Sequence, residues 1–115
     1  MSCCELTWAA GLFEGEGYIC IVSKAGTRGY INNSWRIGVE MTDKDVVERF
    51  AKVFNLNVKF KPRSHKNPKW KNLYVAQVSH QAKVKEIVDA LLPFMGERRR
   101  SKMEEFLGDF KTQCS

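Results

Sequence analysis

Two carboxylates, Glu14 and Glu16, stand at the end of an apolar segment that also carries two glycines one helical turn apart. The segment reads WAAGLFEGEG over residues 8–17. Gly11 and Gly15 each cost a helix about 1 kcal/mol relative to alanine. A stripe without side chains lets a second helix approach closely, which would offset that cost. We therefore expect another helix to pack against this face, with Glu16 beside it.

Glu16 is placed where a helix does not favour an anion. Gly15 and Gly17 flank it, so the chain can turn sharply there and leave the carboxylate at the helix end. The C-terminal end of a helix carries partial negative charge, and a cation beside Glu16 would offset the repulsion. Carboxylate oxygens suit Mg²⁺ or Mn²⁺ better than zinc. The segment therefore predicts a divalent-metal site.

Alternating and clustered apolar residues predict the elements that must position this site. Strands are expected over residues 18–24 and 30–41, forming one hairpin, and over 58–61 and 71–79, forming a second across the turn-rich stretch 62–68. The order is then one helix, two strands, one helix, two strands and further helices.

Two of the later helices have predicted caps. Thr42 is a candidate N-cap for a helix that ends near Asn55, and Ser79 is a candidate N-cap for one that ends at Pro93. Their apolar faces, with that of the last helix, are Val46, Val47, Phe50, Val53 and Phe54; Val84, Ile87, Val88 and Leu91; and Met103, Phe106, Leu107 and Phe110. These faces predict helices packed on a sheet.

Residues 9–17, AAGLFEGEG, resemble the LAGLIDADG motif of homing endonucleases, and the predicted element order resembles that family's core over nearly the whole chain. The resemblance implies an α+β fold, αββαββα with an antiparallel DNA-binding sheet. In that family two motif helices pack together, and their last acidic residues bind divalent metal beside the scissile phosphates. It therefore implies that Glu16 is a catalytic metal ligand, that the Gly15 carbonyl is a further ligand, and that Glu14 is structural.

Only one copy of the motif is present in the 115 residues, which are expected to form one domain over residues 1–115. The second motif helix must then come from another molecule. We expect a homodimer with the two Glu16 side chains near its twofold axis. The expected interface residues are Trp8, Gly11, Leu12 and Gly15.

Residues 92–100, LPFMGERRR, resemble the loop after the family's third helix, where a Pro-aromatic pair precedes a basic residue near the metals. Arg98 matches the position of that basic residue. Arginine cannot act as a base, but it can stabilise phosphate charge. The alternative is a basic patch over residues 98–100 that contacts only DNA backbone or solvent. Asp43 matches a polar position near the active-site solvent of relatives, although an ordinary acidic first turn is favoured for it.

The net charge of +6 is concentrated in the second hairpin, because no Asp or Glu occurs from Arg49 through Lys85. Such a distribution predicts phosphate binding. Arginine, asparagine and glutamate in the first hairpin can also read bases, which favours sequence-specific binding of double-stranded DNA. The candidate DNA-contacting residues are Lys24, Arg28, Asn32, Ser34, Arg36, Glu40, Lys59, Lys61, Arg63, Lys66, Lys69, Lys71 and Gln77.

Other features exclude several classes. No apolar run of about twenty residues is present, so no membrane span is expected. The four cysteines have no paired spacing, which favours a reduced compartment, cytoplasmic or organellar and associated with the nucleoid, rather than secretion. His65 and His80 have no partner for a catalytic triad and are expected in loop or capping roles. No organic cofactor is expected.

Two functions remain open. The first is a homing endonuclease that hydrolyses both strands of a long DNA site with Mg²⁺ and so promotes mobility of the intron that encodes it. The second is a catalytically silent DNA- or RNA-binding protein of the same fold, an intron maturase or a transcription regulator. Glu16 favours the enzyme, and the lack of an added helix-turn-helix argues against the regulator. An RNA maturase stays open, although A-form RNA hides its major groove from such a sheet.

Overall fold

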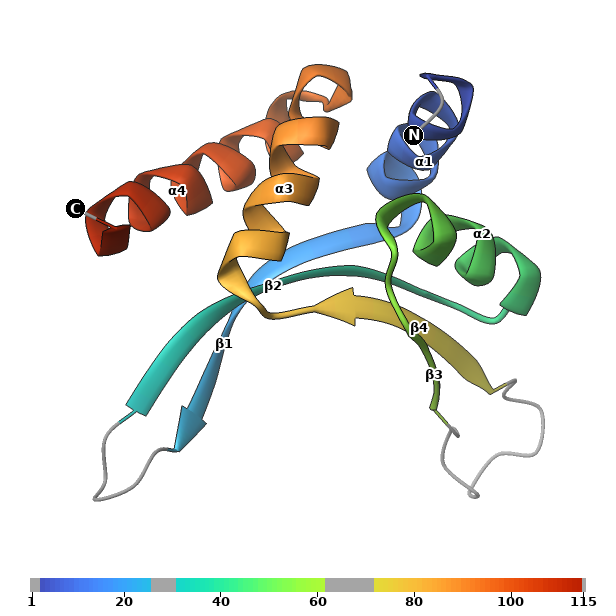
Figure 1. The fold of residues 1–115 in the computed structure, drawn as a ribbon, viewed down its shortest axis with the longest axis horizontal. Helices are drawn as coiled ribbons and strands as arrows, with labels where there is room; N and C mark the ends of the chain where they lie inside the picture. Colours follow the sequence, from blue (N-terminus) through green and yellow to red (C-terminus); the bar gives the residue numbers. More distant parts are fainter. Residues whose placement is uncertain (1–2, 26–30, 62–71, 115) are drawn as a thin grey trace.

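The computed structural model of the chain describes residues 3–25, 31–61 and 72–114. The expected element order is confirmed (Figure 1). In chain order the elements are α1 (Cys3–Glu16), β1 (Gly17–Ala25), β2 (Ile31–Met41), α2 (Lys44–Phe54), β3 (Val58–Lys61), β4 (Leu73–Val78), α3 (Gln81–Leu91), the 3₁₀ helix η2 (Leu92–Phe94) and α4 (Glu97–Cys114). The fold is therefore α+β, as predicted.

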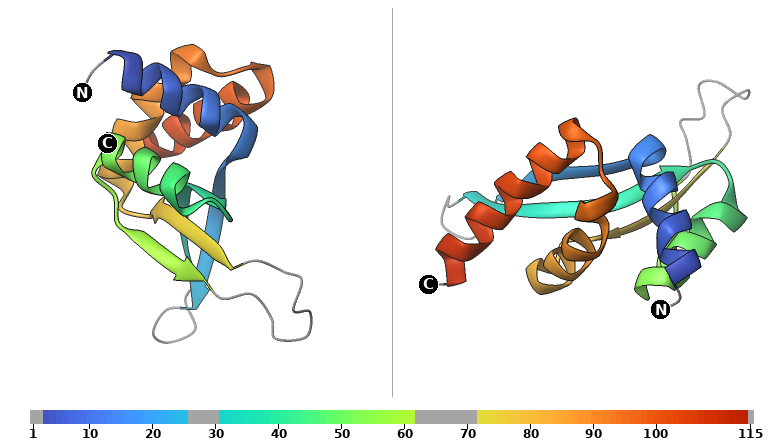
Figure 2. Two further views of the ribbon diagram at one scale, coloured as in Figure 1. Left: turned by 90° about the vertical axis from the view of Figure 1, so that its right-hand side faces the viewer. Right: turned by 90° about the horizontal axis from the view of Figure 1, so that it is seen from above.

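The strands form one antiparallel sheet in the order β1-β2-β4-β3. In β2, one of the two inner strands, Ile37 lies opposite Ile19 of β1 and Val78 of β4. The sheet bends into an arch, with the helices on its convex side (Figures 1 and 2). Its concave face is left open by the described elements.

The core lies between the helices and the convex face of the sheet. Trp35, Ile37 and Val39 of β2 are buried in alternation, as a strand with one covered face requires. Phe13 of α1 stacks on Phe50 of α2, with ring centroids 6.3 Å apart. All four predicted apolar positions of α3 are buried, as are Met103 and Phe106 of α4. The hydrophobic patterns therefore identified the inward faces correctly.

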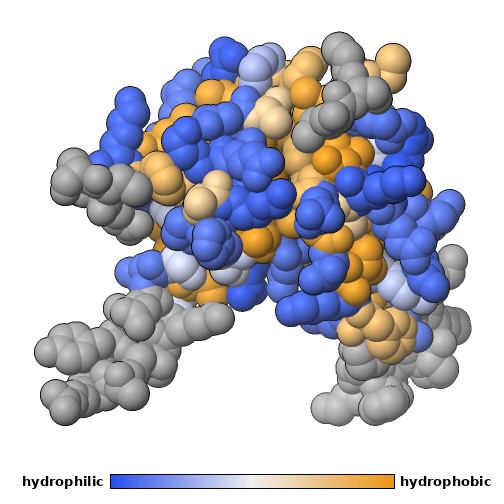
Figure 3. Space-filling view, in the orientation of Figure 1, coloured by the Kyte–Doolittle hydropathy of each residue, from blue (hydrophilic) through white to orange (hydrophobic). Residues whose placement is uncertain are grey.

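The hydropathy of the surface follows this arrangement. In the orientation of Figure 1, hydrophobic atoms gather toward the side of α1 and α2, among hydrophilic ones (Figure 3). Within the described ranges, no helix is both long and apolar enough to cross a membrane.

Both predicted N-caps were wrong. Helix α2 begins one residue later than expected, with Asp43 at its N-cap, and α3 begins after His80; neither side chain makes a capping hydrogen bond. The Ser79 hydroxyl accepts a hydrogen bond from Arg36 Nε at 3.3 Å, so it is held toward the sheet. The predicted end of α2 was right, because Asn55 adopts the left-handed conformation with φ 56°.

The role predicted for Gly17 was also wrong in its reason. Strand β1 begins directly after α1, and neither Gly15 nor Gly17 has a left-handed φ. A Cβ on Gly17 would instead overlap the Phe13 ring. Gly17 is therefore required for space against the core and not for a turn.

Candidate nucleic-acid and metal site

The polar residues of the first hairpin share the concave face of the sheet. Arg36 lies opposite Cys20, and Ser34 lies opposite Val22. The backbones of Lys24 and Asn32 pair in the same register, and their side chains lie outside the described part of the structure. The neighbours of Ser34 and Arg36 along β2 are buried under the helices, so these two side chains face away from the helices.

The same face continues across β4 and β3. Gly38 pairs with Gln77, and Glu40 pairs with Val75, which in turn pairs with Lys59. Gly38 lets the strands approach, because a Cβ there would collide with the carbonyl oxygen of Ala76. All four strands therefore contribute to one polar surface beneath the arch.

An ion pair crosses this surface: Lys61 Nζ lies 3.2 Å from Glu40 Oε1. Lys61 and Glu40 neutralise each other's charge unless another ligand displaces one of them. Because both are at least partly exposed, such a pair contributes little to stability and exchanges readily.

Tyr18 and Gln77 form a polar contact in the middle of the concave face. The Tyr18 hydroxyl donates a hydrogen bond to Gln77 Oε1. Burial, and secondly the nearby charge of Glu40, raise the pKa of Tyr18 to about 12. Tyr18 is therefore a neutral donor at physiological pH. A shallow recess of about 330 Å³ lies beside it and is lined also by Arg36 and Lys61.

Several predicted DNA contacts cannot be placed on this surface. Arg28, Arg63, Lys66, Lys69 and Lys71 lie outside the described residues. Their roles stay predictions from the sequence.

Glu16 is the last residue of α1 and is exposed. It lines a recess of about 340 Å³ together with Glu40 and Asp43. Asp43 makes no capping hydrogen bond, so its carboxylate stays available there. Carboxylate oxygens are the ligand type that Mg²⁺ or Mn²⁺ prefers, although Glu40 is already paired with Lys61. Within the described part of the chain, no group of three or more His, Cys, Asp or Glu side chains is arranged to hold a metal ion.

Glu14, by contrast, is engaged in holding the fold. Its carboxylate accepts a hydrogen bond from the Gly96 backbone N–H at 3.2 Å. Its main-chain carbonyl accepts another from Arg99 Nε at 2.8 Å, and the Arg99 guanidinium lies 5.5 Å from the centre of the Phe13 ring. These contacts tie the end of α1 to the start of α4. They give Glu14 a structural role.

Arg99 was not predicted from the sequence as a residue of this site. It brings a positive charge to the C-terminal end of α1, where the sequence indicated a cation and a bound metal was expected. The favourable interaction with the helix dipole therefore comes at least in part from the protein itself. Three consecutive arginines, residues 98–100, were visible in the sequence, but the one that faces α1 could not be chosen without the phase of α4.

Arg98, the predicted catalytic arginine, is exposed. With Arg99 and Lys102 it lines a recess of about 390 Å³ at the beginning of β1, against Gly17 and Tyr18. It therefore lies next to the strand residues that follow Glu16. Its charge-stabilising role stays a prediction.

The glycine face of α1 is uncovered in the described chain. A Cβ on Gly11 or Gly15 would meet nothing within 4 Å. Trp8 and Leu12, also predicted at an interface, are half-buried beside this face. The Trp8 ring is covered on one side by the guanidinium of Arg49, 4.0 Å from its centroid.

Comparison by sequence finds no relative: no protein-family model matches the chain, and no curated protein does. Comparison of folds gives a different result. The structure of the homing endonuclease I-CvuI in complex with the I-CreI target superposes with a TM-score of 0.70 and 13% identity, covering 88% of this chain and 62% of that one.

Other similar structures are of the same kind. The group I intron-encoded homing endonuclease I-CeuI complexed with DNA has a TM-score of 0.67 at 16% identity, covering 93% of this chain and 54% of that one. The LAGLIDADG meganuclease I-AabMI bound to uncleaved DNA has a TM-score of 0.66 at 14% identity, covering 93% and 35%. The chain thus spans about three fifths or less of these proteins, and at such identities the likeness establishes the fold.

Proposed function

We propose that this chain, which has the LAGLIDADG homing endonuclease fold, is one subunit of a homodimeric, metal-dependent endonuclease that cleaves both strands of a long DNA site. The fold is shared with proteins whose structures were solved on DNA, among them I-CvuI, I-CeuI and I-Vdi141I. The further steps, from fold to cleavage, rest on the chain's own residues.

The observation that carries this proposal is the position of Glu16. Its exposed carboxylate stands where α1 meets the concave sheet, in a recess that Asp43 also lines. The adjacent Glu14 is committed to structural contacts, so the two carboxylates of the motif have different environments. A residue that only packed the fold would have no need of an exposed acid at this junction.

Glu16 and the carbonyl of Gly15 would hold a divalent cation, and Asp43, which lines the same recess, would orient water. When bound, Mg²⁺ would neutralise charge on the attacked phosphate and lower the pKa of water. The protein's part is to hold the carboxylate at the open end of α1 and the DNA along the sheet. Arg98 would stabilise developing phosphate charge through its permanent positive charge.

One chain supplies only part of such a site, which favours a dimer. No complete group of metal-binding side chains occurs among the described residues. The uncovered face at Gly11 and Gly15 lies on the same helix as Glu16. A twofold contact between two such faces would bring the second Glu16 to the first.

The concave sheet would bind the duplex. Its arginine, glutamate and glutamine side chains at Arg36, Glu40 and Gln77 offer donors and acceptors suited to base edges, whereas Lys59 and Lys61 would contact phosphates. Extended strands in the major groove are an established way to read sequence. Cleavage of this site would promote mobility of the intron or other element that encodes the protein.

The test is to incubate the purified protein and its Glu16→Gln variant with a randomised duplex library and Mg²⁺, and then to sequence the ends produced. We expect a single class of double-strand ends from the unmodified protein. The Glu16→Gln variant should retain duplex binding without cutting. An Asp89→Asn variant, altered at an exposed acid on α3, serves as the control that should cut normally.

A second candidate is a catalytically silent DNA- or RNA-binding protein of the same fold, such as an intron maturase. It is favoured by the incomplete ligand set of the described chain. The same incubation separates the two functions. If the unmodified protein binds DNA or RNA but does not cut, the result would contradict the endonuclease and support the binding protein.

A further inference from the structure

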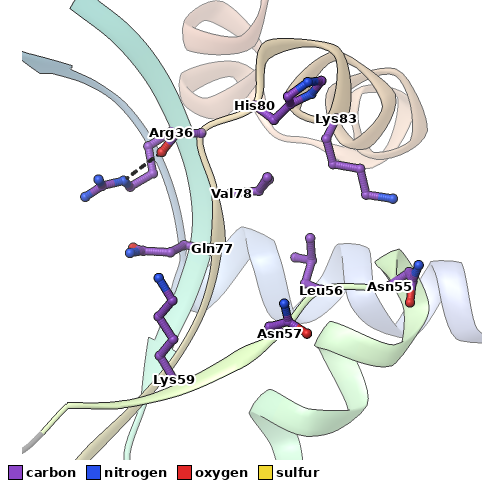
Figure 4. A pocket seen from close by; sticks show the side chains of 10 residues that line it. Arg36, Asn55, Leu56, Asn57, Lys59, Gln77, Val78, His80 and Lys83 are labelled. Atoms are coloured by element: carbon purple, nitrogen blue, oxygen red, sulfur yellow. Dashed lines mark hydrogen bonds between the residues drawn. The ribbon is translucent and has the colours of Figure 1, made fainter.

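A larger recess lies at the edge of the concave face, where β3 begins and where α3 follows β4 (Figure 4). Its volume is about 580 Å³. Its walls come mainly from two short segments, residues 55–59 and residues 77–83, with Arg36 of β2 as a further contributor. These segments are distant in sequence and adjacent in space because β3 pairs with β4.

Both segments belong to the stretch from Arg49 to Lys85 that contains no Asp or Glu. Arg36, Lys59 and Lys83 therefore line the recess without any carboxylate among the lining residues. Lys59 has no ion-pair partner in the described part of the chain. Lys83, which is only partly exposed, pairs with Glu86 of the same helix at 3.2 Å, and because the Glu86 side chain is exposed, another anion can displace it.

The lining side chains approach from both sides of the sheet edge. Figure 4 shows Arg36, Gln77 and Lys59 on one side of the strands, with His80 and Lys83 on the other. Arg36 Nε is already held by the Ser79 hydroxyl, which fixes the direction of its guanidinium. The recess is therefore continuous with the concave face and extends around its margin.

Cationic walls with no carboxylate among the lining residues favour an anion, which would displace Glu86 from Lys83. The recess is open, and it extends from the surface that the proposed function assigns to DNA. A polyanion that follows the concave face and passes its edge would meet Lys59 first and Lys83 next. The repeating phosphates of a nucleic-acid strand are negatively charged and therefore complement these positively charged walls.

We propose that this recess binds the phosphodiester backbone of duplex DNA where one strand leaves the concave face, with Lys59 and Lys83 contacting phosphates from either side of the sheet edge. The inference rests on the proposed function and adds Lys83, His80 and Asn57 to its surface. Because the contacts are to phosphate, they supply affinity and orientation and no base selection.

The test measures how the affinity for a fluorescent duplex of random sequence changes with KCl concentration. Each lost phosphate contact should reduce the slope of log affinity against log salt by about 0.9. In the proposed homodimer each substitution removes two contacts, so we expect a reduction of about 1.8 for Lys83→Gln and about 3.6 for the variant that also carries Lys59→Gln. Circular dichroism verifies that each variant is folded.

Lys85→Gln is the matched control. Lys85 is on the same helix two residues later, where its Nζ pairs with Asp89 at 2.6 Å, and it does not line the recess. Its slope should equal that of the unmodified protein. Equal slopes for Lys83→Gln and Lys85→Gln, with the unmodified protein still binding in a salt-dependent way, would overturn this inference and leave the proposed function intact. No duplex binding by the unmodified protein would overturn both.

A second measurement separates DNA from a small anion. The backbone amide signals of His80 and Lys83 should shift in nuclear magnetic resonance spectra when the duplex is added. Inorganic phosphate at the same ionic strength serves as the comparison. Shifts with phosphate alone, or with neither probe, would contradict a backbone site.

Discussion

Glu14 and Glu16 are two residues apart, and their surroundings give them different roles. Glu14 accepts a hydrogen bond from the Gly96 N–H, and its carbonyl accepts one from Arg99. Glu16 stands exposed in a recess with Asp43. A motif that looks like a repeated acid is therefore one structural residue and one candidate ligand. The distinction depends on which side of the helix end each carboxylate faces.

Gly17 gives a stability prediction at the same scale. Gly17→Ala should lower the free energy of unfolding by about 1–3 kcal/mol, because the added Cβ overlaps the buried Phe13 ring. Gly108→Ala is the control, since a Cβ on that residue of α4 meets nothing within 4 Å. The control should gain up to about 1 kcal/mol from helix propensity. Urea unfolding measures both, and equal effects would contradict the packing role of Gly17.

Tyr18 gives a prediction of pH dependence. Its pKa is raised to about 12 in the folded protein, by burial first, whereas an unfolded tyrosine titrates near 10. The folded state therefore keeps the proton longer. Its contribution to stability is fully present below pH 10 and is lost as pH rises from about 10 to about 12.

Tyrosinate absorbance during a pH titration detects this group directly. The unmodified protein should show a titration step near pH 12 that is missing from Tyr18→Phe. A late step that persists in Tyr18→Phe would assign it to another tyrosine and contradict the buried contact with Gln77.

At the scale of elements, the contact between α1 and α4 positions the candidate ligand. Arg99→Leu should lower the free energy of unfolding by about 0.5–1.5 kcal/mol, because it removes the hydrogen bond to the Glu14 carbonyl. Arg100→Leu is the control, at an exposed position one residue further along α4. Amide hydrogen exchange should also be faster in the last turn of α1 for Arg99→Leu alone. Identical exchange rates in the two variants would contradict the claim that Arg99 stabilises the end of α1.

The sequence was sufficient for the inward and outward faces of the strands and helices, because burial imposes a period that residues such as Trp35, Ile37 and Val39 display. It was not sufficient for the caps. Ser79 has the right chemistry for a cap, but its hydroxyl is engaged by Arg36, which is 43 residues away. Local preference gave way there to a contact that only the folded sheet provides.

The same limit applies to the candidate site. The motif was enough to single out Glu16 and the glycine face. Arg99 could not be preferred to Arg98, because the phase of α4 is set by its packing on the rest of the fold, as where Phe106 meets Trp35. The edge recess was also invisible in the sequence, since residues 55–59 and 77–83 meet only through the pairing of β3 with β4.

At the scale of the whole molecule, the proposed function assigns DNA binding to the concave face and the association of two chains to α1. Gly11→Leu should convert the protein from a dimer to a monomer of 13.2 kDa without unfolding it, because the side chain enters open space in one chain and the partner helix in a dimer. Sedimentation equilibrium measures the mass. Glu104→Leu, at an exposed position of α4, should stay dimeric. If the unmodified chain is monomeric at micromolar concentration, the proposed dimer contact through α1 is wrong.

The central claim is that two chains each contribute one Glu16 to a site that neither completes alone. The most direct test is to co-express the unmodified chain with a ninefold excess of Glu16→Gln chain and to measure double-strand cleavage, with target DNA in molar excess over protein. Random pairing in a symmetric dimer predicts that cleavage per unmodified chain falls about tenfold. Cleavage that stays proportional to the amount of unmodified chain would show that one chain suffices, and would contradict the account.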